Sequence, residues 1–401
     1  MARSQLTQPQ QVSFAQLLTL IPESLHDELA RALSLDKWVP KLSAQLLFKL
    51  VLYSLLDSER LSLRTMAENY KTPWFQSLAG HMLDEVAHTS IRARLMTVKL
   101  DYFEKLYEHV YQQVCRYYSN RELQKYHIKR YDSTMIATFS HLLEGMRVGN
   151  TSRHKTQVKF TTEFKDDLLI RMRFFKDQTH LSEETALKQI IESVEHNVNE
   201  IIVFDRGLKK RQTFESFNDQ QLLFVTRTNE DTRYQVIESA SEIADIHTDD
   251  LQFIQDSKVY LYASGNQLCE TPFRLVEVKR KKDDQTILFL TNIFHLTAPE
   301  IANIYYLRWD IEVLFRFLKQ EMNLKHFVSN DANAIMVMLY CTLIAATLIL
   351  VYRKQNSIRS HKMAKIRFFY ELQATVILEL LDIEGGVDRL RQNVTKYLKR
   401  E

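Results

Sequence analysis

The chain has 401 residues, a length that favours two or three domains. Its 45% hydrophobic and 26% charged residues are ordinary for a soluble globular protein, and the scarcity of glycine (7) and proline (6) argues against long flexible linkers and against an all-β protein built on tight turns. The net charge is only +3, so the total charge gives no argument for nucleic-acid binding. Such binding would have to depend on local basic patches such as residues 279–282 or 389–400. Each patch could equally be a solvated face.

Cysteine usage and the first residues bear on the compartment. Cys115, Cys269 and Cys341 lie far apart, so the sequence contains no zinc-ligand spacing and implies no disulfide framework. This usage suits a reducing compartment. Residues 1–11 are polar and carry no apolar signal core, which makes a secreted protein unexpected. We therefore expect a cytoplasmic protein.

The N-terminal region is expected to be helical. Apolar residues recur at helical spacing from residue 12 to about residue 120, which predicts an all-helical domain over residues 1–120. A short predicted helix within it carries Arg92 and Arg94 on one side. This helix resembles the recognition half of a helix-turn-helix, with residues 63–70 as its partner. The two arginines could read DNA bases, or the helix could be an ordinary one with exposed arginines.

A different pattern begins near residue 121. Short alternating or apolar runs predict strands, and they are interleaved with two amphipathic helices. This order indicates a mixed α/β core over residues 121–228. The expected strands are residues 126–132, 157–164, 168–175, 200–205 and 222–226, and the expected helices are residues 183–194 and 209–217.

The last part of the chain is predicted to contain a β-rich insertion over residues 229–295, followed by a return to helix over residues 296–401. Thr297-Ala-Pro-Glu300 has the form of a capping box and should open a helix of about six turns. Residues 332–352 carry no charge and are long enough to cross a membrane. We expect a helix buried in a large core and no membrane contact, with a single-span membrane protein as the alternative.

The predicted helix after Thr297 presents an unusual set of side chains. At about 100° per residue, Tyr305, Arg308, Glu312 and Lys319 fall within roughly 60° of one another, on one face of the helix. The adjacent stripe is apolar and should pack against the core. An exposed amphipathic helix with i, i+4 ion pairs would show a similar face.

The spacing Tyr305-x2-Arg308-x3-Glu312-x6-Lys319 resembles the signature (YREK) of the insertion-sequence-four family of bacterial transposases. Asp132, in the run Tyr-Asp-Ser-Thr, and Asp205, in Val-Phe-Asp-Arg-Gly, are similar to the first two catalytic aspartates of that family. The order of elements also resembles the family, with a helical region ahead of an RNase H-like core that a β-rich insertion interrupts before the glutamate helix.

The resemblance implies a DDE transposase that cuts DNA at transposon ends and transfers the freed strands to target DNA. Asp132, Asp205 and Glu312 would be the catalytic carboxylates and would hold two Mg²⁺ ions, with Mn²⁺ as a substitute. Two ions about 4 Å apart can serve both the attacking and the leaving oxygen, so we expect the three carboxyl groups within about 10 Å of one another. Asp132 and Asp205 are expected at strand ends.

Further residues are expected to contact DNA. By resemblance, Tyr305, Arg308 and Lys319 would hold the DNA end and its terminal phosphate, and Arg206 and Lys209 could add backbone contacts. Residues 1–120 would bind the transposon ends. The protein would act as at least a homodimer on DNA, in association with the bacterial nucleoid. The alternative is a catalytically inactive or domesticated relative that binds DNA without cutting it.

The sequence departs from some relatives in one respect. Those proteins stack a flipped DNA base on a tryptophan in the β-rich insertion, but Trp38, Trp74 and Trp309 all lie outside residues 229–295. Other aromatic rings of the insertion could stack a base, although core packing is the favoured role for each of them. The candidates are Tyr234, Phe253, Tyr260 and Tyr262.

Overall fold

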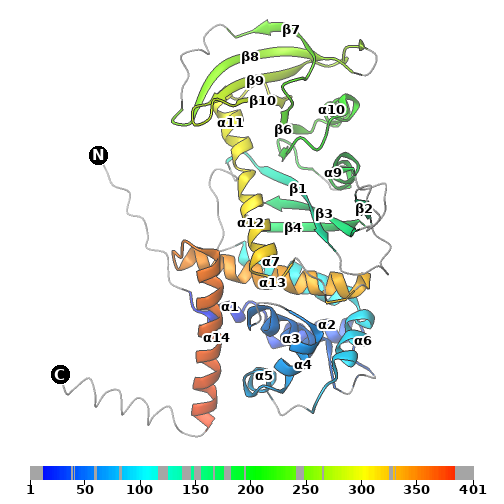
Figure 1. Ribbon diagram of the computed structural model, residues 1–401, viewed down its shortest axis with the longest axis vertical. Coiled ribbons are helices and arrows are strands. Elements are labelled where there is room, and N and C mark those ends of the chain that lie inside the picture. Colours follow the sequence, from blue (N-terminus) through cyan, green and yellow to red (C-terminus); the bar gives the residue numbers. More distant parts are fainter. Residues whose placement is uncertain are drawn as a thin grey trace, which may run out of the picture. The chain divides into compact units, whose positions relative to one another are not determined.

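The computed structural model of the chain divides into two compact units (Figure 1). One consists of Met1–Tyr117 with Arg316–Glu401, and the other of Tyr118–Phe315. This division differs from the expected one, because residues after Phe315 group with the N-terminal helices and not with the α/β core. The residues described are 12–37, 39, 41–57, 61–80, 84–115, 125–137, 146–148, 155–165, 168–175, 182–193, 196–240, 248–263, 266–324, 328–329 and 331–383.

The first unit is built from helices, as the spacing of apolar residues predicts. Side-chain caps fix several helix starts: Ser13, Ser62 and Thr72 each accept a hydrogen bond from a backbone N–H in the first turn. The helices of this unit are α1 (Phe14–Leu18), α2 (Glu23–Ala32), α3 (Ala44–Asp57), α4 (Leu63–Lys71), α5 (Pro73–Ala79), α6 (His88–Thr97), α7 (Leu100–Val114), α13 (Ala332–Gln355) and α14 (His361–Ile383).

Helix α13 is the charge-free segment noted in the sequence. It is the one helix among the described residues that is long and apolar enough to cross a membrane, yet 89% of its most apolar stretch is buried inside the unit. It packs against α3, α6, α7 and α14 (Figure 1). The amide of Asn333 donates hydrogen bonds to the carbonyl oxygens of Leu95 and Val98, which ties α13 to α6. These contacts are those of a core helix, and the membrane-spanning alternative is not supported.

The second unit is organised around one mixed sheet with the strand order β2-β3-β1-β5-β6-β10-β9-β8-β7, and β4 pairs with β3. β1 is parallel to β5, and β5 is parallel to β6, while the other pairs are antiparallel. The strands are β1 (Ile128–Ala137), β2 (Met146–Val148), β3 (Lys155–Lys165), β4 (Leu168–Phe175), β5 (Ile201–Phe204), β6 (Leu223–Thr228), β7 (Tyr234–Ser239), β8 (Leu251–Leu261), β9 (Phe273–Arg280) and β10 (Thr286–Thr291).

The expected elements between residues 126 and 226 are confirmed, with shifted ends. The β-rich segment is also present, but it does not form a sheet of its own. Its last strand, β10, pairs with β6, so β7–β10 continue the core sheet as the curved strands at the top of Figure 1. Among the described residues of this unit, the sheet is joined by α9 (Glu183–Glu192), α10 (Arg211–Asp219), α11 (Ala298–Tyr306) and the first half of α12 (Trp309–Gln320).

Helices cover both faces of this sheet. Ile201 and Val203 of β5 belong to the core beneath α11, whereas Ile202 and Phe204 belong to the core beneath α9 and α10. All four side chains are buried, because a strand that is covered on both faces must be apolar at every position. The polar residue that follows, Asp205, therefore lies where β5 leaves the core.

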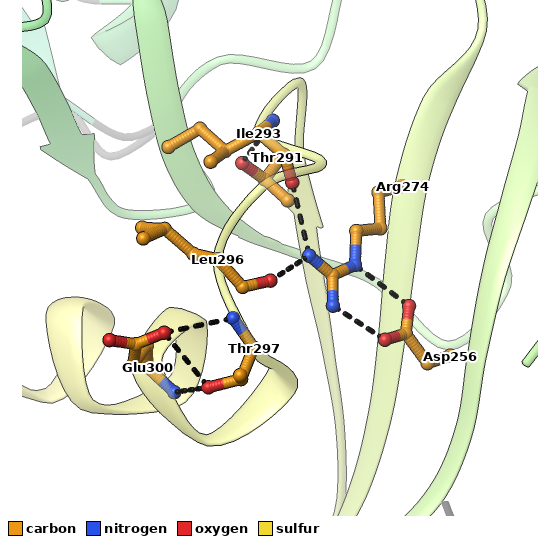
Figure 2. Close-up of polar contacts among 7 residues, drawn as sticks. All are labelled: Asp256, Arg274, Thr291, Ile293, Leu296, Thr297 and Glu300. Atoms are coloured by element: carbon orange, nitrogen blue, oxygen red, sulfur yellow. Dashed lines mark hydrogen bonds and ion pairs between the residues drawn. The ribbon is translucent and has the colours of Figure 1, made fainter. Parts of the chain in front are cut away.

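A buried ion pair fixes the start of α11 (Figure 2). Arg274 of β9 binds both carboxylate oxygens of Asp256 on β8, at 2.6 and 2.9 Å. The same guanidinium donates to the backbone carbonyls of Ile293 and Leu296, which immediately precede the helix. This ion pair therefore positions the helix that carries Tyr305.

Candidate active site

The predicted six-turn helix is in fact two helices. The capping box of Thr297 and Glu300 is confirmed, but α11 ends at Tyr306 and α12 begins at Trp309. In an unbroken helix the carbonyl of Leu307 would accept a hydrogen bond from a backbone N–H of the next turn. Here it accepts a hydrogen bond of 2.6 Å from the Arg130 guanidinium on β1. The N–H of Arg308 instead donates to the Tyr305 carbonyl, three residues back. The helix is thus interrupted at Leu307 and Arg308, and the expectation of one continuous helix is wrong.

Three acidic side chains reach this interruption from three separate elements. Asp132 lies on β1, Asp205 follows β5, and Glu312 lies in the first turn of α12. β1 and β5 are parallel neighbours with Tyr131 beside Phe204, so the two aspartates occupy the next positions along adjacent strands. Asp205 is at a strand end, as expected. Asp132 is not, because β1 continues to Ala137.

The guanidinium of Arg308 contacts all three carboxylates. Its Nη2 lies 2.7 Å from Glu312 Oε1 and 3.9 Å from Asp205 Oδ2, and its Nη1 lies 3.5 Å from Asp132 Oδ2. The three carboxyl groups are therefore closer together than the about 10 Å that a shared two-ion site allows. The Arg308 side chain is only 4% exposed, so a buried cation holds this cluster together.

Tyr305 completes the cluster. Its hydroxyl donates a hydrogen bond of 2.8 Å to Asp205 Oδ1, and its ring lies 5.5 Å from the guanidinium of Arg308. Burial raises the pKa of the Tyr305 hydroxyl, so the group stays protonated and remains a donor. The spacing read from the sequence thus brings Tyr305, Arg308 and Glu312 together, although they do not share one continuous helix.

The charges in the cluster stabilise one another. Burial alone would raise the pKa of the Asp205 carboxyl, but the Arg308 charge and the hydrogen bonds that the carboxylate accepts keep this pKa below its ordinary value. Burial alone would lower the pKa of Arg308, yet Tyr305 and the neighbouring carboxylates raise it above its ordinary value. Both groups are therefore charged at neutral pH, and the site carries an excess of negative charge.

Carboxylate oxygens are the ligands that Mg²⁺ prefers. Among the described residues, no three acidic, histidine or cysteine side chains converge closely enough to hold one ion between them. The Arg308 guanidinium contacts all three carboxylates. Three carboxylates gathered around a single positive charge nevertheless suit additional cations, and the donor set fits a divalent metal ion.

The other expected DNA contacts are dispersed. Arg206 and Lys209 are exposed in the loop after β5, next to Asp205. Lys319 is half-buried on α12, beyond the residue at which the second unit ends. Arg206, Lys209 and Tyr262, the last of which is one of the aromatic candidates, line a common cavity. Phe253 is 1% exposed and belongs to the core beneath α11, so its ring has the packing role.

The structure contradicts the expected role of one of the two arginines in the predicted helix-turn-helix. Arg92 of α6 is exposed, but Arg94 turns into the helical unit. Its guanidinium forms an ion pair with Asp36 and donates a hydrogen bond of 3.0 Å to the carbonyl of Leu42. Because these acceptors occupy the guanidinium, the expectation that Arg94 reads DNA bases is wrong. Its ion pair connects α6 to the chain before α3.

Two arginines near the site were not singled out from the sequence. Arg130, on an alternating strand, is 1% exposed and holds the turn at Leu307. Arg227 of β6 contributes to the low pKa of Asp205. Neither arginine could be identified from the residues next to it in the sequence, because each acts on a residue far away along the chain. Trp38 and the basic residues 389–400 lie outside the described part of the chain.

Residues 124–348 match the transposase DDE domain family. The chain belongs to this family. The match includes Asp132, Asp205 and Glu312, so the domain spans the carboxylate cluster.

Relatives of known description are transposases. The chain is 31% identical over 156 residues to a protein of Sinorhizobium fredii that carries the name of a transposase, an alignment that covers 39% of this chain and 43% of the relative. It is 26% identical over 182 residues to a protein named as the transposase of an insertion sequence element of Geobacillus stearothermophilus, which covers 44% of this chain and 47% of that protein. The chain thus spans less than half the length of each relative.

Among solved structures, the chain is similar to a cryo-EM structure of the piggyBac transposase synaptic complex with hairpin DNA. The superposition has a TM-score of 0.47 at 13% identity and covers 96% of this chain and 84% of the other. A TM-score of this size does not establish a shared fold, so the topology described above depends on the strand pairings alone.

Proposed function

We propose that this chain is a DDE transposase that cuts DNA at the ends of a transposable element and joins the freed 3′-hydroxyl groups to target DNA. The observation that carries this proposal is the convergence of Asp132, Asp205 and Glu312 on the guanidinium of Arg308. Membership of the transposase DDE domain family supports it.

The strand order supports the finer assignment to an RNase H-like core. Three antiparallel strands, β4, β3 and β1, are followed by β5 and β6, which run parallel to β1 on its other side. The spacing from Tyr305 to Lys319 supports assignment to the insertion-sequence-four family, which carries the YREK signature. The contacts among Tyr305, Arg308 and Glu312 give a physical reason for that spacing.

Asp132, Asp205 and Glu312 would hold the Mg²⁺ ions, with Mn²⁺ as a substitute. The ions would supply Lewis acidity at the scissile phosphate and charge stabilisation for the attacking and leaving oxygens. Tyr305 holds Asp205 in one orientation through its hydroxyl. Arg308 gathers the three carboxylates, which reduces the reorganisation that the site requires.

DNA would be held by cations of both units. Arg308 and Lys319 would bind phosphates of the element's end, which for Arg308 requires its guanidinium to leave the carboxylates when the metal ions bind. Arg206 and Lys209 would contact the backbone beside Asp205, and Arg92 would contact DNA from the helical unit. Because two ends must be joined, we propose at least a homodimer on DNA, acting at the bacterial nucleoid.

The proposal is tested with the full chain and a supercoiled plasmid that carries the inverted repeats flanking its reading frame. We expect Mg²⁺-dependent nicks that leave 3′-hydroxyl groups at the repeat ends, followed by strand transfer to a second plasmid. Binding of the repeats without any nick, in Mg²⁺ or Mn²⁺, would identify the chain as an inactive DNA-binding relative.

A further inference from the structure

A cavity of about 280 Å³ lies beside the carboxylate cluster within the α/β unit. Its wall is formed by the loop after β5, the start of α10, the end of β6 with the turn that follows it, and the end of β8. The side chains that give the cavity its character are Arg206, Lys209, Arg211, Arg227, Arg233 and Tyr262. Of these five cations, only Arg206 and Lys209 are among the DNA contacts expected from the sequence.

The cavity is strongly positive. Five cations line it against one carboxylate, that of Asp231, whereas the whole chain carries a net charge of only +3. Within the described part of the chain, none of the five forms an ion pair with a carboxylate. Like charges crowded in this way repel one another, so the arrangement costs stability unless an anion offsets it.

The basic run at residues 279–282 offers a comparison on the same sheet. There, Arg280 is paired with Asp283 at 2.7 Å, and Lys279 is paired with Asp284 at 3.2 Å. Two of the four cations in that patch are thus paired within the protein itself. The five cations of the cavity form no such direct ion pairs within the described part of the chain, which favours a partner from outside the chain.

Two arginines of the cavity are available to donate hydrogen bonds to a bound anion. Arg233 stacks over the ring of Tyr262 at 5.1 Å and donates a hydrogen bond of 2.7 Å to Asn266, which fixes its position. Arg227 has a buried Nε with no hydrogen-bond partner in the described structure. A buried donor without an acceptor is unfavourable.

The cavity also adjoins the reaction site. Arg206 follows Asp205 directly in the chain, and the charge of Arg227 helps to lower the pKa of the Asp205 carboxyl. A strand that passes the carboxylates would therefore meet these cations next. At about 280 Å³ the space is at the small end of ligand sites, which suits one or two phosphates of a single strand and not a duplex.

We propose that this cavity binds the backbone phosphates of the single DNA strand that continues from the carboxylate cluster. The proposal rests on the proposed transposase function and adds Arg211, Arg227 and Arg233 to its DNA contacts. Its recognition is electrostatic, so it should be independent of base sequence and strongly dependent on salt.

The test compares two triple variants of the full chain that each remove three positive charges. One is Arg206→Gln, Lys209→Gln and Arg233→Gln in the cavity, where all three side chains are exposed. The matched control is Lys279→Gln, Lys281→Gln and Lys282→Gln. Binding of a fluorescein-labelled single-stranded oligonucleotide is measured by anisotropy in EDTA, over about 50–300 mM salt. Thermal melting shows that both variants are folded.

We expect the cavity variant to bind at least about tenfold more weakly, with a salt slope smaller by about 2, since each single-strand phosphate contact contributes about 0.7. The control should change the slope by less than about 0.5. Equal effects of the two variants, or no effect of either, would overturn the proposal. Displacement of the oligonucleotide by equimolar nucleoside triphosphate would also overturn it, because the cavity would then be a nucleotide site.

The two proposals fail separately. Binding in EDTA needs no cleavage, so a cavity effect without plasmid nicking would contradict the transposase activity alone. Nicking that survives with an unchanged salt slope in the cavity variant would contradict the phosphate site alone.

Discussion

Replacing Glu312 with glutamine should lower the rate of metal-dependent DNA cleavage by about 1,000-fold, the equivalent of about 4 kcal/mol of lost transition-state stabilisation. The substitution removes one carboxylate charge while preserving the shape of the side chain. Glu312 is 36% exposed, and an amide oxygen can still accept the hydrogen bond from Arg308, so folding stability should change little. The cleavage rate in single-turnover conditions and the melting temperature together check this result.

The matched control is Glu238→Gln, which removes an exposed carboxylate of the same unit on β7, the strand at the end of the sheet order. It should cleave at the rate of the unchanged chain. Asp132→Asn and Asp205→Asn should behave like Glu312→Gln. If any one of the three amide variants retained more than about a tenth of the cleavage rate, a loss of under about 1.4 kcal/mol, that residue would not be a metal ligand in the reaction.

The second large effect concerns stability without metal. Replacing Arg308 with glutamine should lower the free energy of unfolding by about 2–3 kcal/mol at pH 7, because three carboxylates lose the cation that gathers them. This range already allows for the partial exposure of Asp205 and Glu312. Added Mg²⁺ should restore more stability to the variant than to the unchanged chain, since it replaces the missing charge.

The pH dependence of this effect has a definite sign. In the unchanged chain the folded-state pKa of Asp205 is lowered, so its contribution to stability is present above the ordinary pKa of a carboxyl group, about 4, and is lost as the pH falls through the folded value. Without Arg308, burial remains and that pKa rises. The stability deficit of Arg308→Gln should therefore be largest near neutral pH and should narrow as the pH falls below about 4.

Chemical denaturation in EDTA at several pH values measures this deficit. Arg316→Gln provides the control, because Arg316 is an exposed cation on the same helix, α12. An Arg308→Gln deficit that stays constant on acidification, or that Arg316→Gln reproduces, would show that Arg308 contributes through packing and not through the carboxylates.

The site was predictable where the sequence encodes local geometry. The spacing of Tyr305, Arg308 and Glu312 predicted that these side chains gather, and the apolar run before Asp205 predicted its place at the end of a buried strand. Both depend on residues close together in the chain. The apolar length of α13 was likewise visible, although only its packing shows that it is a core helix.

The features that could not be predicted depend on distant contacts. The break between α11 and α12 requires Arg130 to reach the carbonyl of Leu307, from a residue far earlier in the chain. The Arg94 side chain turns inward because it pairs with Asp36, which lies before α3 in the chain. The pairing of β10 with β6, which makes the β-rich segment part of the core sheet, is also non-local. Periodicity along one segment carries no information on such partners.

One measurement tests the shared metal site directly. The full chain is loaded with Fe²⁺ in place of Mg²⁺, and ascorbate and peroxide then generate hydroxyl radicals at the bound ion, which cut the polypeptide nearby. We expect cuts beside Asp132, Asp205 and Glu312 in the same experiment, suppressed by excess Mg²⁺ and absent in Glu312→Gln. Cuts confined to other segments, or none that Mg²⁺ suppresses, would contradict the claim that these three side chains grip the metal together.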